Sequence, residues 1–453
     1  MDKEGFLELI TADRDAHIAL LQNFVQAPSP NPPGDTAEAA KVLIDYLAEQ
    51  GVEVEIIAPQ GDERPNLVAE FTCGDDGGRG GSEPITHNNG GEEERGEDDG
   101  PRVIMNGHID VFPVDRVQSH KWSHGGPWSG YNDGTHIYGR GGVDMKAGTT
   151  ASVIAFAYLH RIRHLLKRTG SSVALTVVSD EETGGKFGSR YLLEQDPRKG
   201  RWKGTVMINA EPGGLQSIRF GEKGTLRVTF TITTSGAHGA YTHLTEGANR
   251  VAARLITRLL SIEGMEPDLD PEIRKRMALP EVRAVVDEIM GIGAAKHVLK
   301  PTVNIGTVHG GVKVNMIPDR CVLEADIRLP IGLTRDPVLA HIDEILASEF
   351  HGTVSYQVQE AASNPPSHCD PAHAMVSALA EAAARVTHSK PPLAIPSLGA
   401  TDAKFWRYHG VPAYVFGVSP ETMAAGVDER VSVEEFLAVV RTHALAVWEY
   451  LGG

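Results

Sequence analysis

Histidine and carboxylate residues follow several apolar stretches of the sequence, and these side-chain types suit chemistry at a bound metal ion. The stretches are "RVIMNG", "SSVALTVVS" and "GTVMINA", and a glycine-rich turn, "YGRGGV", precedes a further acid. The residues concerned are His108, Asp110, Asp144, Asp180, Glu181, Glu182 and Glu211. Several carboxylates beside one imidazole would raise one another's pKa values unless a cation compensated their charge. The sequence therefore predicts a divalent metal site.

The ligand types narrow the choice of metal. Imidazole and carboxylate ligands without a thiolate suit Zn²⁺, Mn²⁺ or Co²⁺, and three protein ligands with one water leave a coordination position open for catalysis. Asp110 is expected to orient the ring of His108 without itself binding the ion. Taken singly, each acid is more simply explained as a solvated loop residue or a helix cap, because charged side chains are mostly exposed. Only their joint arrangement favours a metal site.

The stretches that precede these residues predict parallel strands whose ends would bring the residues together. Apolar β-branched runs alternate with helical runs over residues 1–220, which is typical of βαβ units in a sheet buried on both faces. Ligand groups in such sheets gather beyond the carboxyl ends of the strands. The first of the helical runs, residues 3–26, predicts one amphipathic helix.

A second pattern begins at about residue 221 and predicts an inserted domain. The strand "GTLRVTFTITTSG" is followed by a helix, two strands, a helix near 334–350 and the strand "GTVSYQVQEAA". This β-α-β-β-α-β order predicts a compact ferredoxin-like α+β domain over residues 221–362. The alternation of strand and helix resumes over residues 363–453, where the first domain is completed. The predicted fold class is α/β, with a mixed, mostly parallel sheet and helices on both faces.

The balance of charge argues against a nucleic-acid or anionic-membrane partner. The chain has 453 residues, with 43 Lys and Arg against 60 Asp and Glu, and a formal net charge of −17. Such partners are bound by clustered Lys and Arg. No stretch has the length and apolar character of a bilayer span, and the first residues lack the pattern of a secretory signal. We expect a soluble, cytoplasmic protein.

Other parts of the sequence predict no site. Residues 74–100 contain nine acids, two arginines and nine glycines, a composition that cannot supply a core and predicts an acidic surface loop. The three cysteines, Cys73, Cys321 and Cys369, lie far apart without CxxC spacing, so we expect reduced thiols. The motifs GxSxG, GxxxxGK[ST] and HExxH are absent, which argues against a serine hydrolase, a P-loop protein and a zincin.

Seven short segments give the sequence a resemblance to a known family. In chain order they are "NGHIDVFP", "IYGRGGVDMKAG", "SDEETGG", "NAEPGG", "SGAHGAYTH", "VNMIPDRCVLEADIRLP" and "GATDAKFW". Together they resemble the zinc metallohydrolase family of aminoacylases, acetylornithine deacetylase, succinyl-diaminopimelate desuccinylase and glutamate carboxypeptidases. The resemblance runs from about residue 103 to the C-terminus. It implies a zinc-peptidase-like fold, one or two ions per subunit, and a homodimer formed through the inserted domain, which acts as a lid.

The resemblance also implies a role for each residue of the metal site. His108 and Glu211 would bind one ion, and Asp144 would bridge to a second ion that Glu182 also binds. Glu181 corresponds to the general base, which would take a proton from metal-activated water and pass it to the leaving nitrogen. Adjacent residues at a strand end point in different directions, so that Glu181 and Glu182 can hold different roles.

Five further residues match substrate-side positions of the family. His238 would reach the active site of the partner subunit and stabilise the oxyanion, whereas a simple turn histidine is the alternative. Arg328 and Asn315 would bind a substrate carboxylate or backbone, for which an Arg fork is well suited. A structural salt bridge is the competing interpretation of Arg328. Gly399 and Thr401 would contact substrate from a glycine-rich loop, and a plain turn explains them equally well.

One position departs from the family pattern. Relatives complete the second metal site with a histidine four residues before a glutamate, and counting back from Glu429 reaches Ala425, which cannot bind metal. Asp428, His409 or a water would have to replace the missing ligand, or the second ion is lost. We expect the site of His108, Asp144 and Glu211 to persist and the Glu182 site to be weak or empty.

Two classes of function follow from these observations. The first is a metal-dependent amidohydrolase that cleaves an N-acyl amino acid or a small peptide-like substrate. The second is a divergent family member that performs a different amide-type reaction in specialised metabolism, or acts as a non-catalytic binding protein. Because Glu181, His238 and Arg328 are all retained, the enzyme is the favoured interpretation.

Overall fold

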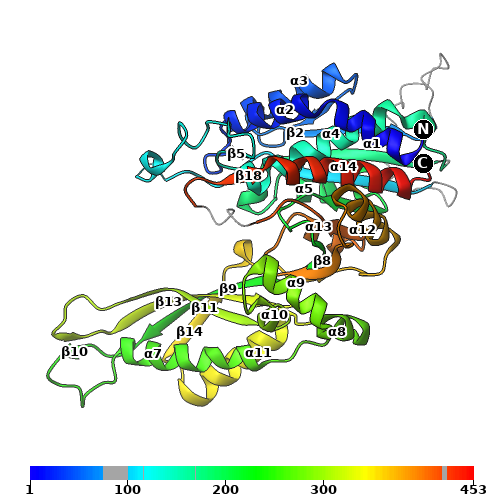
Figure 1. The fold of residues 1–453 in the computed structure, drawn as a ribbon. Coiled ribbons are helices and arrows are strands. Elements are labelled where there is room, and N and C mark those ends of the chain that lie inside the picture. The colour runs from blue at the N-terminus through cyan, green and yellow to red at the C-terminus, as the bar shows by residue number, and fades with distance from the viewer. Residues whose placement is uncertain (75–99, 116, 169, 421–425) are drawn as a thin grey trace. The chain divides into compact units, whose positions relative to one another are not determined.

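The computed structural model describes residues 1–74, 100–115, 117–168, 170–420 and 426–453. The acidic segment expected over 74–100 lies outside the described residues except for its two ends, and Ala425 also lies outside them. The chain divides into two compact units (Figure 1). Unit 1 comprises Met1–Phe220, Cys369–Ile395 and Thr401–Gly453, and unit 2 comprises Gly221–His368 and Pro396–Ala400. Among the helices of the described residues, none has the length and apolar character needed to cross a membrane.

A mixed sheet forms the core of unit 1. Its parallel centre runs in the order β6 (Ser172–Val178), β3 (Arg102–His108), β7 (Val206–Asn209) and β17 (Ala413–Val415). Antiparallel strands β2 (Asn66–Thr72) and β1 (Glu55–Ile57) extend one edge, and β8 (Ser217–Glu222), with which β16 (Leu393–Ser397) pairs, joins the other. Every residue of β6 and β7 is buried, as expected of strands that are covered on both faces. The predicted fold class is confirmed.

Helices cover both faces of this sheet. On one face, α4 (Ala147–Arg161) packs against β3 and β6 and also contacts α14 (Val433–Tyr450), which in turn contacts α12 (Ala374–Thr387). On the other face, α5 (Ser189–Glu194), α6 (Lys199–Lys203) and α13 (Ala403–Tyr408) bury Leu192, Trp202 and Trp406 against the strands. A small sheet of β4 (Tyr131–Asn132), β5 (His136–Tyr138) and β18 (Arg430–Ser432) completes the unit.

The N-terminal segment forms two helices where the sequence predicted one over residues 3–26. Helix α1 (Lys3–Ala12) and helix α2 (Arg14–Gln26) meet at Asp13, and α3 (Ala37–Glu49) follows them. The backbone of Asp13 leaves helical geometry at φ −98° and ψ 22°, and its carboxylate accepts a hydrogen bond from the hydroxyl of Tyr158 in α4. The local apolar periodicity continues across this break. Such a pattern cannot show a contact with a residue far along the chain, so the sequence predicted a single helix.

The start of α4 packs directly against the ends of two strands. Gly148 lies so close to β7 that a Cβ atom would collide with the carbonyl oxygen of Ala210. The hydroxyl of Thr149 donates to the carbonyl of His108 at 2.6 Å. Only glycine permits so close an approach, so the helix fixes the chain at His108 and next to Glu211.

Unit 2 is built on a four-stranded antiparallel sheet in the order β11-β13-β9-β14. Along the chain the elements are β9 (Gly224–Thr233), α7 (Ala248–Leu259), β11 (Thr302–Gly310), β13 (Arg320–Leu329), α11 (Arg335–Glu349) and β14 (Val354–Val358). This is the predicted β-α-β-β-α-β order. Phe230 of the sheet packs in one core with Leu255 of α7 and Ile342 of α11, so both helices cover the same face (Figure 1).

Several elements of unit 2 were not predicted. Helices α8 (Pro271–Ala278), α9 (Pro280–Met290) and α10 (Ala294–His297) stand between α7 and β11. A two-stranded ribbon joins β10 (Ala237–His238) to β12 (Met316–Ile317), and β15 (Ser367–His368) pairs with the end of β8. Asp270 caps α8 by accepting from the amide of Glu272, and a proline occupies the first helical position, a combination that favours helix initiation.

Candidate metal centre

Parallel strands deliver the histidine and three of the acids to one edge of the sheet in unit 1. β3 ends at His108, beside the end of β6, and β7 runs parallel to β3 on its other side. Glu181 and Glu182 follow β6 in a short helical turn, η4 (Glu181–Thr183), and Glu211 follows β7. These residues therefore lie beyond the same edge, as the strand order predicts.

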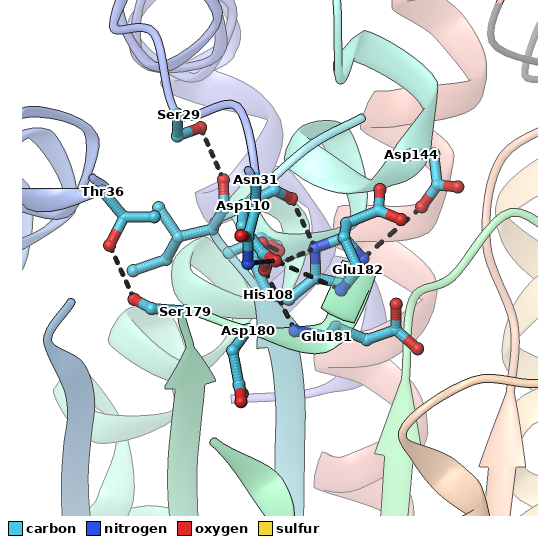
Figure 2. A network of polar contacts seen from close by, with 12 residues as sticks. Ser29, Asn31, Thr36, His108, Asp110, Asp144, Ser179, Asp180, Glu181 and Glu182 are labelled. Atoms are coloured by element: carbon cyan, nitrogen blue, oxygen red, sulfur yellow. Dashed lines mark hydrogen bonds and ion pairs between the residues drawn. The ribbon is translucent and has the colours of Figure 1, made fainter. Parts of the chain in front are cut away.

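The side chains converge on the imidazole of His108 (Figure 2). Its Nε2 lies 3.4 Å from Oδ1 of Asp144, which comes from the turn η2 (Gly142–Lys146), and 3.4 Å from Oε1 of Glu211. Two groups of ligand atoms lie within 4.8 Å of one another: one from His108, Glu181 and Glu211, and the other from His108, Asp144 and Glu182. All five predicted metal and base residues are thus brought together.

Buried atoms without hydrogen-bond partners show that the cluster fits a cation. His108 is 1% exposed and its Nε2 makes no hydrogen bond, although it faces carboxylates. Oε1 of Glu182 is likewise buried without a hydrogen-bond partner. Buried polar atoms are normally paired. A cation between the imidazole and the acids would satisfy these atoms and is chemically matched to the nitrogen and oxygen ligands present.

Asp110 organises the site through two different groups. Nδ1 of His108 lies 2.7 Å from the main-chain oxygen of Asp110, and because a carbonyl only accepts, Nδ1 donates and Nε2 is free to bind metal. The carboxylate of Asp110, expected to orient the ring, is 3.6 Å from Nδ1. It accepts instead from the amides of Glu181 at 3.2 Å and Glu182 at 3.1 Å, and from the side-chain amide of Asn31 at 2.9 Å.

Burial perturbs the protonation of the cluster. Burial raises the pKa of Glu211 to about 7, with the negative charge of Asp144 adding to the effect. The same two causes raise the pKa of Glu182 to about 10, and burial raises the pKa of Glu181 well above its usual value. Burial opposes protonation of His108, but the carboxylates of Asp144 and Glu211 outweigh it and raise its pKa. A divalent ion would displace the protons that these groups otherwise hold.

Comparison with known proteins identifies the family. The model of peptidase family M20/M25/M40 matches residues 104–449, which include every residue of the cluster. The chain belongs to the M20/M25/M40 peptidase family. It is therefore a hydrolase that acts on amide or peptide bonds, and a metal-binding one.

Individual relatives of this M20-family chain agree with that assignment. A succinyl-diaminopimelate desuccinylase of Methylorubrum extorquens is 27% identical over 423 residues, covering 92% of this chain and 94% of the relative. The fold matches the M20 family metallo-carboxypeptidase Sso-CP2 of Sulfolobus solfataricus with a TM-score of 0.72 at 18% identity, over 96% of this chain and 99% of that one. Human carnosine dipeptidase 1 matches with a TM-score of 0.68 at 16% identity, over 99% and 100%.

Two buried asparagines of the M20-family sheet support Glu211, and the sequence did not reveal them. The side-chain oxygen of Asn209 accepts from the amide of Glu211 at 2.6 Å. Its nitrogen donates to Asn106 of the neighbouring strand at 2.8 Å, and Asn106 donates to the hydroxyl of Thr176 at 3.1 Å. Polar residues inside an otherwise apolar strand, just before a ligand, are the signal that was available in the sequence.

Glu429 supports Asp144 and was also missed as a functional residue. Its carboxylate is 1% exposed and pairs with Nη1 of Arg140 at 2.7 Å. It also accepts from the amides of Gly141 at 3.1 Å, Val143 at 2.8 Å and Asp144 at 3.2 Å. Glu429, which in the sequence only marked the position of Ala425, therefore binds the turn that carries Asp144.

The substrate-side residues lie in both units. In unit 2, His238 of β10 is exposed and pairs with Met316, and the amide of the following Gly239 donates to the carbonyl of Asn315 at 2.8 Å. Nε of Arg328 lies 2.9 Å from Oδ1 of Asp326, so that the ion pair proposed as the competing interpretation is present.

The glycine-rich loop spans the boundary between the units. The amide of Gly399 in unit 2 donates to the hydroxyl of Ser397 at 3.2 Å. Thr401 in unit 1 is buried, and its carbonyl accepts from Nζ of Lys404 at 3.0 Å. These contacts describe a well-anchored turn, and the contact of either residue with substrate stays a prediction.

Neither residue suggested as a replacement for the missing histidine joins the described cluster. Nε2 of His409 lies 3.8 Å from Oε1 of Glu194 on α5. The carboxylate of Asp428 accepts from the amide of Ser123 at 2.7 Å and from its hydroxyl at 2.9 Å. Of the two groups of potential ligands formed by the described residues, neither includes His409 or Asp428. The described residues give neither suggestion support, and the replacement of the missing ligand stays a prediction.

Proposed function

We propose that this M20-family chain hydrolyses the amide bond of an N-acyl amino acid or a small peptide-like substrate, with Glu181 as the general base. The observation that supports this most strongly is the convergence of His108, Asp144, Glu182 and Glu211 around the unpartnered Nε2 atom, with Glu181 at its margin. A site with these ligands and an adjacent carboxylate is suited to hydrolysis by an activated water.

The residues of the metal centre have different roles in this proposal. His108, Asp144 and Glu211 would hold the first ion, and Asp144 and Glu182 would hold a second. A bound Zn²⁺, Mn²⁺ or Co²⁺ would supply Lewis-acid polarisation and lower the pKa of a water. Glu181 accepts the proton of the attacking water and returns it to the leaving nitrogen.

The second ion is the point at which this chain departs from its relatives. Ala425 replaces the expected histidine, and the described residues supply only Asp144 and Glu182 beside the shared His108. We propose that the ion bound by His108, Asp144 and Glu211 is the tighter one and that the Glu182 site is weak or empty. The loss favours, as the second candidate, a different amide-type reaction in specialised metabolism or a binding protein.

Residues of unit 2, together with Thr401 of unit 1, are the remaining groups of the proposal. Arg328 and Asn315 would bind the substrate carboxylate or backbone, and Gly399 and Thr401 would contact the substrate from their loop. His238 would donate to the oxyanion in the site of the partner subunit of a homodimer. Strand β11 lies at the edge of the unit 2 sheet with Val308 exposed, which offers a surface for such a dimer.

Metal analysis and a substrate panel test the proposal. N-acetyl and N-succinyl amino acids and dipeptides are assayed with and without added Zn²⁺, Mn²⁺ or Co²⁺. Glu181→Gln should lower kcat by at least about 100-fold with metal content retained, because general-base catalysis contributes about that much or more. The exposed Glu434→Gln is the matched control and should behave as wild type. If no substrate turns over with any metal while ligands still bind, the second candidate replaces the first.

A further inference from the structure

Two adjacent glutamates of the metal centre need different partners if one is to be a base and the other a ligand. Glu181 and Glu182 lie side by side in the turn η4, and their side chains leave the chain in different directions (Figure 2). Yet a carboxylate oxygen of Glu181 lies within 4.8 Å of a ring nitrogen of His108 and an oxygen of Glu211. Glu181 is therefore near enough to become a ligand itself, which would remove the base.

Lys404 lies where it is able to keep the carboxylate of Glu181 from binding the metal. Its Nζ lies 3.7 Å from Oε1 of Glu181, and the two side chains are 9% and 14% exposed. The ammonium donates to the carbonyl of Thr401 at 3.0 Å, at the start of α13, so its position is fixed by the main chain. Within the part of the chain that the structure describes, the Glu181 carboxylate has no other ion-pair partner.

The backbone of Glu181 is anchored separately from its side chain. The amide of Glu181 donates to Asp110, and so does the amide of Glu182, which leaves the direction of each carboxylate to side-chain contacts. Among the described residues, Lys404 lies beside Glu181, whereas no lysine or arginine pairs with Glu182. An ion pair between two largely buried groups is screened little by water and is able to hold a flexible carboxylate in one orientation.

We infer that Lys404 is a positioning residue that holds the carboxylate of Glu181 apart from the metal ligands, so that Glu181 remains a base while Glu182 beside it binds metal. The inference rests on the proposed function, because it assigns the base and the ligands as above. It adds a residue that acts through Glu181. Without Lys404, Glu181 is free to turn toward the ion held by His108 and Glu211.

Binding of Co²⁺ and steady-state kinetics on the full chain test the inference. Lys404→Met should lower kcat by about 10-fold to 100-fold, a part of the contribution of a general base, with KM changed little. It should also change the visible spectrum of bound Co²⁺, because a new carboxylate enters the coordination shell. Lys404→Arg retains the charge and should restore both properties. Lys186→Met, which removes an exposed lysine between η4 and α5, is the matched control and should leave both unchanged.

A double-mutant cycle separates positioning from a general effect of charge. Removing any nearby cation strengthens Co²⁺ binding, but capture by Glu181 adds affinity only if the carboxylate is present. Lys404→Met should therefore tighten Co²⁺ binding at least about 10-fold more in wild type than in the Glu181→Gln background. Equal tightening in both backgrounds, or wild-type kcat in Lys404→Met, overturns the inference alone. A wild-type protein that binds no Co²⁺ overturns the proposed function, and the inference with it.

Discussion

Replacing Glu429 by glutamine tests whether the buried carboxylate holds the turn that carries Asp144. In the structure it pairs with Arg140 and accepts from three main-chain amides, at distances of 2.7 to 3.2 Å. Glu429→Gln keeps the size of the side chain but removes the charge that compensates Arg140, and it turns an NH₂ group toward donors. Breaking a buried ion pair costs about 3–5 kcal/mol. We expect a loss of about 3 kcal/mol in the free energy of unfolding, a large part of the about 5–15 kcal/mol that stabilises a typical protein.

Urea denaturation followed by tryptophan fluorescence measures this loss of stability in unit 1. All five tryptophans, Trp122, Trp128, Trp202, Trp406 and Trp448, belong to unit 1, as does Glu429. The control Glu434→Gln removes an exposed carboxylate that pairs with Arg14 and should change stability by at most about 0.5 kcal/mol. A loss below about 1 kcal/mol for Glu429→Gln would show that the buried ion pair does not stabilise the turn.

Four further predictions concern the metal centre and the substrate side. Because burial raises the pKa of Glu211 to about 7 and that of Glu182 to about 10, metal must displace protons. The affinity for Zn²⁺ should therefore rise by about 10-fold per pH unit between pH 6 and 7 for each proton displaced, and an affinity constant with pH in calorimetry would contradict this. The same raised pKa values give the metal-free protein a stabilising contribution that is fully present below the ordinary glutamate pKa and is lost as pH rises toward about 7, which thermal unfolding across that range measures. Asn209→Leu leaves the amide of Glu211 and the side-chain oxygen of Asn106 without the partner that Asn209 provides. We expect metal affinity to fall by about 10-fold to 100-fold in equilibrium dialysis, and an unchanged affinity would exclude the supporting role. Arg328→Met should raise KM for a substrate with a free carboxylate far more than for its amide, whereas an equal change for both would leave the ion pair with Asp326 as the role of Arg328.

The sequence predicted that the residues of the candidate metal centre would lie together because most of them directly follow strands of the parallel part of the sheet. His108 and Glu211 each follow an apolar run, and parallel strands that lie side by side end at the same edge. The β-α-β-β-α-β order of unit 2 could be predicted for the same reason, since each strand and helix has its own local period.

The supporting residues could not be predicted because their partners are distant in the sequence. Glu429 accepts from the amide of Asp144, which lies 285 positions earlier, and Lys404 lies beside Glu181 only in the folded chain. Nothing local distinguishes Glu429 from the solvated acids that surround it. The break between α1 and α2 at Asp13 has the same origin, because it coincides with a hydrogen bond from Tyr158.

A mutation of Asp110 would remove its side-chain contacts with the two glutamates but not its main-chain contact with His108. Its main-chain oxygen fixes which nitrogen of the imidazole carries the proton, and every amino acid at position 110 has that oxygen. Its side chain, in contrast, accepts from the amides of the two glutamates and so helps to hold their turn. A substitution at position 110 is therefore able to change the positions of Glu181 and Glu182, whereas the proton stays on Nδ1 of His108.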